Sequence, residues 1–278
     1  MSNSMRNKIK RIYRSEGING LLKATFIKVF KSSKYSPDFK KIARDVTDHL
    51  AISNQTNPEV YKRLSEGVYY VFGMGVEGDI AEFGTMSGRT AVALSAAINY
   101  CNDALIASDK LHGFSGERKL WLFDSFEDLP SASTSIDKNS LHVASGIWGR
   151  GTCLGMSADA LLNLTSSFLS KSKIIIVKGW FKDTVPNIPS DKKFSMLHID
   201  GDLYESAIDV LDSLFSRNMI SKGAQIFFDD WNCNAADPNF GERLAWQEMI
   251  VKYNIIHSDE GSYGTVSHRF IVHNYHSI

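Results

Sequence analysis

The chain has 278 residues, of which 43% are hydrophobic and 22% charged, which is ordinary for a soluble globular protein. This length fits one α/β domain with extensions as well as two small domains. No stretch approaches eighteen unbroken apolar residues, and the N-terminal segment lacks the apolar region of a secretory signal; we expect neither a transmembrane span nor export, and a cytoplasmic location. Three cysteines without CxxC spacing argue against a disulfide framework or a zinc knot.

The formal net charge of zero hides a basic N-terminal segment. Residues 1–44 carry 12 lysines and arginines against two acids, so the rest of the chain has an excess of ten acids. Within this segment, Leu21–Phe30 has helical spacing with lysines to one side. We interpret residues 1–57 as a basic helical extension that packs on its own domain or a sister subunit, or that contacts anionic lipid or an acidic partner. Nucleic acid is not an expected partner, because the acidic remainder would repel phosphate.

Residues 58–278 alternate between helical and strand patterns and are expected to form the main domain. Helical periodicity predicts helices at Pro58–Phe72, Arg89–Tyr100, Ala158–Leu169, Leu203–Arg217 and Glu242–Tyr253. Short apolar runs predict strands at Asp79–Gly84, Lys119–Ser125, Lys173–Trp180, Phe194–Asp200, Ala224–Asp230, Ile255–Ile256 and His268–His273. This alternation predicts an α/β fold with a mostly parallel sheet, helices on both faces and an antiparallel edge hairpin. Residues 130–155 lack periodicity and predict a long loop.

Two glycine-rich segments differ in their context. Gly73–Gly78 reads GMGVEG, which fits the dinucleotide-binding fingerprint, but it follows a helix and leads into a strand. We therefore interpret it as a helix stop and turn. Glu82–Ala91 reads EFGTMSGRTA and lies correctly between a strand and a helix. Its acid and its hydroxyls (Glu82, Thr85, Ser87 and Thr90) suit a cationic amino acid moiety better than a pyrophosphate, and Gly84 and Gly88 let the backbone approach a ligand.

Asp124 ends the next predicted strand, at a position where an acid can accept hydrogen bonds from both hydroxyls of a ribose. The alternative is that Asp124 and Ser125 only cap a following turn. Together with the glycine loop upstream, the position favours a nucleoside site.

Four further acids follow two neighbouring strands. They are Asp200 and Asp202 in LHIDGDLYES, and Asp229 and Asp230 in IFFDDW. Carboxylates gathered at one sheet edge repel each other unless they are protonated or bind a cation, and a hard divalent ion with oxygen ligands relieves the repulsion most simply. The alternatives are a helix cap by Asp202 and a polar strand end at Asp229 and Asp230. His198, inside the first of these strands, is interpreted as a packed histidine rather than a ligand.

The motifs EFGTMSG, WLFDSFEDLP, VKGWFKDTVP, LHIDGDLYES and FFDDW resemble, in order and spacing, those of the macrocin O-methyltransferase family. Its members are class I enzymes that use S-adenosylmethionine to methylate sugar hydroxyls of natural products. The resemblance runs from about Val76 to Met249. The N-terminal extension, residues 130–155 and the tail after Tyr253 show no match, and Trp231 stands where the family has tyrosine.

The resemblance implies a seven-stranded Rossmann-like sheet and a set of site residues. The donor methionine would lie at Glu82, Gly84 and Gly88, its ribose at Asp124 beside Ser125 and Phe126, and its adenine by Gly179 and Trp180. A magnesium ion would lie on Asp200, Asp229 and Asp230, with Asp202 as general base. The acceptor would be a glycan or small molecule, and such enzymes often form homo-oligomers.

Methyl transfer from a sulfonium needs an aligned and competent oxygen nucleophile, which a cation and a carboxylate base can supply. The same metal chemistry would also serve a phenolic or catechol-like hydroxyl. From a different class, a non-catalytic methyltransferase-like scaffold is the remaining alternative.

Overall fold

The computed structural model describes residues 58–105 and 117–276, and the predictions for the basic extension, residues 1–57, lie outside this part of the chain. The strands are β1 (Asp79–Phe83), β2 (Leu120–Asp124), β3 (Ile174–Lys178), β4 (Phe194–Ile199), β5 (Ile220–Phe228), β6 (Ile256–Tyr263) and β7 (Ser267–Asn274). The α-helices are α3 (Pro58–Gly73), α4 (Arg89–Leu105), α5 (Ser135–Asn139), α6 (Leu141–Ala144), α7 (Ala158–Thr165), α8 (Phe181–Thr184), α9 (Tyr204–Ser216) and α10 (Gly241–Tyr253).

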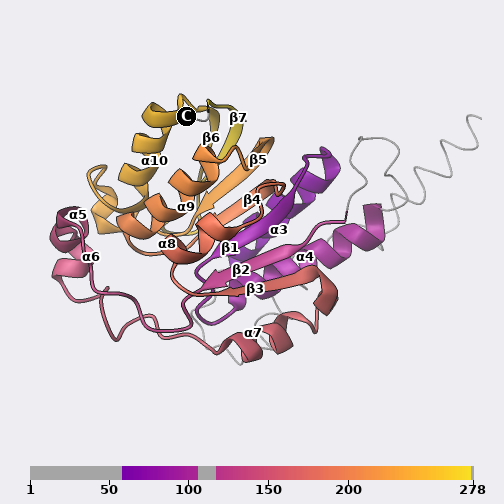
Figure 1. The fold of residues 1–278 in the computed structure, drawn as a ribbon, viewed down its shortest axis with the longest axis horizontal. Helices are drawn as coiled ribbons and strands as arrows, with labels where there is room; N and C mark the ends of the chain where they lie inside the picture. Colours follow the sequence, from indigo (N-terminus) through magenta and orange to yellow (C-terminus); the bar gives the residue numbers. More distant parts are fainter. Residues whose placement is uncertain (1–57, 106–116, 277–278) are drawn as a thin grey trace, which may run out of the picture. The chain divides into compact units, whose positions relative to one another are not determined.

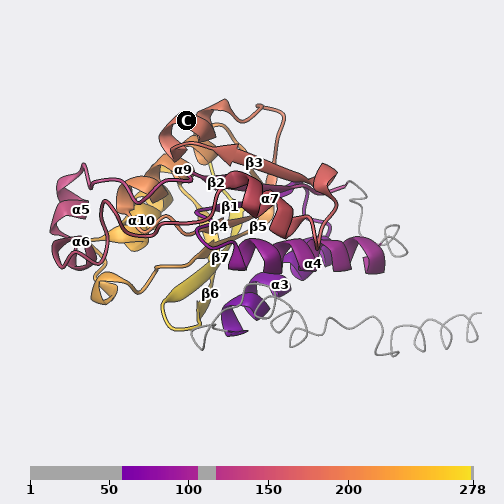
Figure 2. The same ribbon diagram turned by 90° about the horizontal axis from the view of Figure 1, so that it is seen from below.

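The seven strands form one sheet in the order β3-β2-β1-β4-β5-β7-β6. β1 to β5 pair in parallel, and the β6–β7 hairpin adds antiparallel strands at the edge. Helices α3, α4 and α7 cover one face, and α8, α9 and α10 cover the other (Figures 1 and 2). The predicted α/β fold class is confirmed, because this is the Rossmann-like sheet of class I methyltransferases.

Both faces of the sheet are buried, which explains why its central strands are nearly continuous apolar runs. In β1, Ala81 and Phe83 join the core under α9 and α10, whereas Ile80 joins the core under α3 and α4. Burying each large apolar side chain contributes about 1.5–3 kcal/mol. The parallel strands are therefore held rigidly, and all their carboxyl ends lie along one edge of the sheet.

The predicted helices and strands all occur, with differences at their ends and in the loops. β5 begins four residues before the predicted Ala224, because the polar residues and Gly223 at its start hide the apolar pattern. β6 is longer than predicted, since it lies at the sheet edge and has an irregular register with β7. The predicted long loop at 130–155 contains the short helices α5 and α6, and α8 was not expected.

The GMGVEG segment is a helix stop and turn, as predicted. α3 ends at Gly73, and Gly75 and Gly78 have φ angles of 62° and 114°, which favour glycine. A Cβ atom at Gly78 would lie 2.6 Å from the carbonyl oxygen of Lys193. The segment therefore connects α3 to β1. In the described residues, no helix has the length and apolarity needed to cross a bilayer.

Candidate active site

A cavity of about 730 Å³ lies where the loops after the parallel strands meet. Most of the predicted site residues line it, namely Gly84, Thr85, Ser87, Thr90, Asp124, Ser125, Gly179, Trp180, Asp200, Asp202, Asp229 and Asp230. Three predicted donor-binding residues, Glu82, Gly88 and Phe126, are not among its lining residues. The sheet therefore brings the two predicted halves of the site into one cavity. These halves are the glycine-containing loop after β1, here called the donor loop, and the four carboxylates.

The loop after β1 is pressed directly against the loop after β4. Gly84 has a φ angle of +93°, and a Cβ atom there would lie 1.8 Å from the carbonyl oxygen of Asp200. The amide of Asp200 in turn donates to the carbonyl of Phe83 at 2.9 Å. Only glycine permits this approach at position 84. Gly88 serves packing instead, because a Cβ atom there would lie 2.9 Å from Leu161 of α7.

Asp124 connects the loop after β1 to the end of β2. Its Oδ2 accepts hydrogen bonds from the amide of Thr85 (2.7 Å), the hydroxyl of Thr85 (2.9 Å) and the amide of Met86 (3.1 Å). Its Oδ1 accepts from the amide of Phe126 at 2.7 Å, which is the turn cap considered as the alternative. Asp124 therefore shapes the donor loop and the following turn while it lines the cavity.

The carboxylates after β4 and β5 perturb one another. Burial, followed by the charges of Asp229 and Asp230, raises the pKa of Asp200 well above its ordinary value. Burial, then the charges of Asp202 and Asp229, raises the pKa of Asp230 in the same way. Burial also raises the pKa of Asp202 to about 6, although a hydrogen bond with Cys153 lowers it. The carboxylates thus oppose one another's ionisation, and a bound cation would favour their ionised forms.

Sequence reasoning missed a fifth carboxylate, that of Glu242 in the first turn of α10. Its side chain is buried, and its Oε2 accepts a hydrogen bond from the amide of Asp230 at 3.0 Å. Burial and the charges of Asp230 and Asp229 raise the pKa of Glu242 well above its ordinary value. No sequence signal marked Glu242, because its place beneath Asp230 depends on how α10 packs against β5.

The oxygen atoms of this carboxylate cluster are suitable ligands for a hard divalent cation. Carboxylate oxygens are the ligands that magnesium prefers, and the buried Oδ2 of Asp230 has no hydrogen-bond partner. Within residues 58–105 and 117–276, no three His, Cys, Asp or Glu side chains already surround a common point as a finished metal site. Binding would therefore require rotation of at least one carboxylate.

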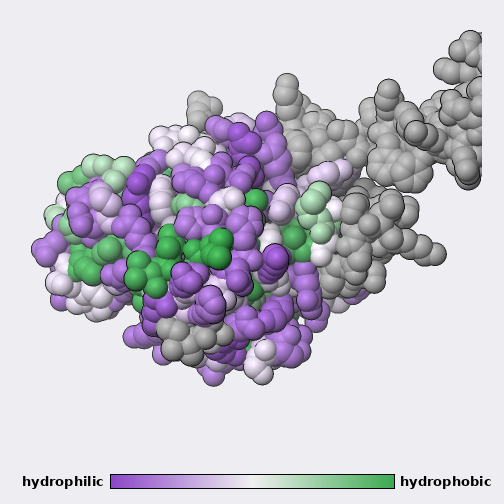
Figure 3. Space-filling view, turned by 90° about the horizontal axis from the view of Figure 1, so that it is seen from above, coloured by the Kyte–Doolittle hydropathy of each residue, from purple (hydrophilic) through white to green (hydrophobic). Residues whose placement is uncertain are grey.

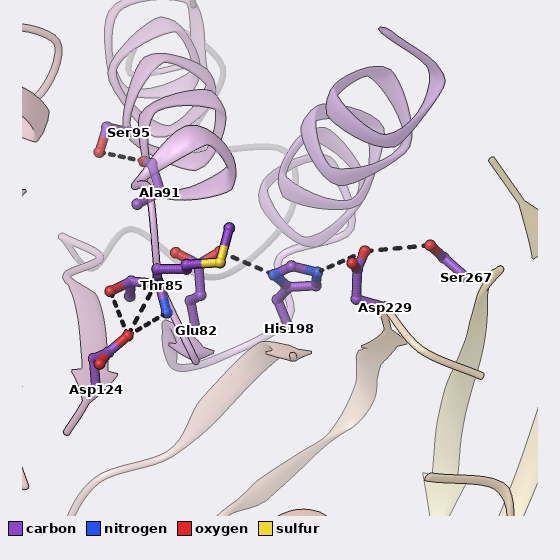
Figure 4. A network of polar contacts seen from close by, with 9 residues as sticks. Glu82, Thr85, Ala91, Ser95, Asp124, His198, Asp229 and Ser267 are labelled. Carbon is purple, nitrogen blue, oxygen red and sulfur yellow. Dashed lines mark hydrogen bonds and ion pairs between the residues drawn. The ribbon is translucent and has the colours of Figure 1, made fainter. Parts of the chain in front are cut away.

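A row of polar side chains runs from Glu82 through His198 to Asp229 and Ser267 (Figure 4). His198 Nδ1 lies 2.9 Å from Oε1 of Glu82, and His198 Nε2 lies 3.7 Å from Oδ1 of Asp229. Burial lowers the pKa of His198, but its contacts with Asp229 and Glu82 outweigh burial and raise that pKa to about 10. His198 is thus packed inside the sheet, as predicted, while Glu82 faces this histidine rather than the cavity.

The segment from Asp128 to Ser157 forms one wall of the cavity through Leu129, Pro130, Ser131, Ser133 and Cys153. It is attached to α9, whose N-cap residue Leu203 makes no side-chain cap. Instead, the carboxylate of Asp137 accepts from the amides of Tyr204 (2.8 Å) and Glu205 (3.1 Å). Asp202 therefore does not cap this helix.

The wall segment also carries exposed apolar residues. Figure 3 shows hydrophobic atoms in a band across one mainly hydrophilic face of the protein. Leu141, Ile147 and Leu154 belong to the wall segment and are exposed, and Leu154 directly follows the cavity-lining Cys153. The wall segment thus combines residues that line the cavity with exposed apolar residues that do not.

A family model described as macrocin-O-methyltransferase (TylF) matches residues 22–250, so the match begins well before Val76 and includes part of the basic extension. A tetracenomycin-C rhamnosyl 4'-O-methyltransferase of Streptomyces olivaceus is 30% identical over 166 residues, which are 58% of this chain and 56% of that protein. Demethyldecarbamoylnovobiocin O-methyltransferase of Streptomyces niveus is 28% identical over 171 residues, 61% of this chain and 59% of that protein. The chain spans somewhat more than half the length of these relatives.

Two solved structures have a similar fold. The O-methyltransferase NovP superposes with a TM-score of 0.59 at 24% identity, over 77% of this chain and 79% of that chain. The calicheamicin methyltransferase CalS11 superposes with a TM-score of 0.52 at 19% identity, over 84% and 93% of the two chains.

Proposed function

The chain belongs to the macrocin O-methyltransferase family, and on this premise we propose that it transfers a methyl group from S-adenosylmethionine to a sugar hydroxyl on a glycoside, natural product or polysaccharide. We further propose that Mg²⁺ and a general base, Asp202, assist the transfer. One observation carries the proposal: a single cavity joins the glycine loop and Asp124 to the carboxylates after β4 and β5.

The donor half of the cavity suits a nucleoside attached to a cationic amino acid. Gly84 and the hydroxyls of Thr85, Ser87 and Thr90 would surround the methionine end, and Asp124 the ribose, with Ser125 beside it. Gly179 and Trp180, at the end of β3, would lie by the adenine. Glu82, Gly88 and Phe126 would act on this site indirectly, by shaping the loops that line it.

The acceptor half suits activation of a hydroxyl group. A Mg²⁺ ion on Asp200, Asp229 and Asp230 would stabilise the negative charge that develops on the acceptor oxygen. Asp202 lies in the left-handed region, with φ of 59°, and lines the same cavity. With a pKa of about 6, its carboxylate is mostly ionised at neutral pH and can accept the hydroxyl proton.

The proposed acceptor class follows from named relatives. The Streptomyces olivaceus protein is a rhamnosyl 4'-O-methyltransferase by name, and a Micromonospora griseorubida relative, 26% identical over 182 residues, is named mycinamicin III 3''-O-methyltransferase. Both names describe methylation of an oxygen, and the first also names a rhamnosyl sugar. A sugar hydroxyl is therefore the acceptor that we propose for this chain.

The test is an assay of purified full-length protein with S-adenosylmethionine and a panel of deoxysugar glycosides, oligosaccharides and phenols. We expect donor binding in titration calorimetry, methylation of a glycoside, and loss of turnover with EDTA that added Mg²⁺ restores. Absence of donor binding would refute the proposal altogether. Full activity in EDTA would refute the metal role, and methylation of phenols alone would refute the acceptor class.

A further inference from the structure

We propose that His198 is a positioning residue which, held by Glu82, orients the Asp229 carboxylate for cation binding. The inference rests on the proposed function, and it concerns two buried residues that lie outside the cavity lining. Neither Glu82 nor His198 lines the cavity, and both side chains are fully buried.

The strand register places the three groups in one row. Glu82 of β1 pairs with His198 of β4, and His198 pairs with Phe227 of β5. Paired residues on neighbouring strands lie on the same face of a sheet, and side chains two residues apart in a strand share a face. Asp229 comes two residues after Phe227, so its side chain leaves the sheet on the same face as Glu82 and His198. Figure 4 shows the three side chains in line.

Two contacts on one oxygen favour one orientation of the Asp229 carboxylate. Its Oδ1 faces Nε2 of His198 at 3.7 Å and accepts a hydrogen bond from the hydroxyl of Ser267 at 3.2 Å. With both groups on the same oxygen, Oδ2 is left for the cavity that Asp229 lines. A carboxylate fixed in this way loses less freedom when it binds a cation than a freely rotating one.

Glu82 fixes the imidazole ring itself. Its Oε1 lies 2.9 Å from Nδ1 of His198, so the other ring nitrogen is aimed at Asp229. That nitrogen, Nε2, is buried and has no partner within hydrogen-bond distance. The polar group that it faces is Oδ1 of Asp229, 3.7 Å away, which is the distance of an ion-pair contact. Partners of this kind behind metal ligands typically change metal affinity by about 10–100-fold.

The experiment must separate positioning from a merely structural role. Removing His198 alone would leave Glu82 buried without a partner, so the main variant is Glu82→Leu/His198→Phe, which replaces both polar partners by apolar groups. His198→Gln is the second variant, because it stays polar and similar in size. His273→Phe is the matched control, since it changes a histidine of the edge hairpin that does not line the cavity.

Mn²⁺ binding is measured by electron paramagnetic resonance, S-adenosylhomocysteine binding by calorimetry, and the unfolding midpoint by scanning calorimetry. We expect the double variant to unfold cooperatively and to bind Mn²⁺ about 10–100-fold more weakly than the wild type. His198→Gln, which keeps Glu82, should lose Mn²⁺ affinity in the same direction, with donor-product affinity within about twofold of the wild type. His273→Phe should retain both affinities.

Unchanged Mn²⁺ affinity in the folded double variant would overturn the inference and leave the proposed function standing. If the double variant does not fold, His198→Gln decides, and wild-type Mn²⁺ affinity in that protein overturns the inference. If the wild type binds no Mn²⁺, the metal part of the proposed function fails, and this inference fails with it.

Discussion

Removal of the Asp137 carboxylate should destabilise the domain more than loss of an ordinary helix cap. Its two oxygens accept from the amides of Tyr204 and Glu205 at the start of α9, 67 and 68 residues away in the chain. An exposed cap is worth about 1 kcal/mol. Because Asp137 is 1% exposed, water cannot replace it, and each amide left unpaired costs about 1–3 kcal/mol. We therefore expect Asp137→Ala to lower the free energy of unfolding by about 2–4 kcal/mol.

The measurement is the unfolding midpoint by calorimetry, supported by urea titration. For a domain of this size, the expected loss corresponds to a midpoint lowered by roughly 5–15 °C. Asp159→Ala is the control, because this exposed acid in the first turn of α7 contributes at most about 0.3–1 kcal/mol through the helix dipole. Acceptor KM should rise in Asp137→Ala, while donor affinity stays near that of the wild type. Equal midpoints for the two variants would refute the reasoning.

Three further predictions concern the cavity. Asp202→Asn should lower kcat by about 10²–10⁴-fold with unchanged donor affinity, and kcat near that of the wild type would remove Asp202 as base. Gly84→Ala should lower the free energy of unfolding by about 3–5 kcal/mol and abolish donor binding, because the new Cβ atom would clash with the carbonyl oxygen of Asp200. Gly146→Ala is the control, because this glycine has a positive φ angle but no atom within 4 Å of an added Cβ, and it should lower the free energy of unfolding by only about 1–2 kcal/mol. Equal losses for the two variants in urea titration would contradict the predicted difference. The raised pKa values of Asp200 and Asp230 mean that these carboxyl groups bind protons more tightly in the folded state than in the unfolded state. Their contribution to stability is therefore greatest below the ordinary pKa of 3.8 and is lost as the pH rises through their pKa values in the folded state. The midpoint of the metal-free protein should therefore fall as the pH rises from below 3.8 toward and above neutrality. The fall should be less steep in Asp230→Asn, and an equal slope would contradict the assignment.

The sheet and the gathering of the carboxylates were predictable because both depend on local patterns. Buried parallel strands are continuous apolar runs, and acids that directly follow such strands must meet at the same edge of the sheet. The sequence therefore predicted that Asp124, Asp200 and Asp229 share one site. It also distinguished the glycine loop at Gly84 from the turn at Gly73–Gly78 by the order of helix and strand.

Other features depend on contacts between distant parts of the chain and had no local signal. α5 and α6 have only five and four residues, too few to show a helical period. The cap of α9 by Asp137 depends on how the wall segment packs. Similarly, the sequence placed Glu82 at the end of β1 but could not show that its side chain faces His198 rather than the cavity.

The central claim is that the methyl donor and a divalent cation bind in the same cavity. The most direct measurement is a crystal structure of the full chain with S-adenosylhomocysteine and Mn²⁺, using anomalous diffraction to locate the metal. We expect an anomalous peak coordinated by Asp200, Asp229 and Asp230, with the nucleoside against the loop after β1. A donor product bound in the cavity at saturating Mn²⁺, without a peak at these carboxylates, would contradict the claim.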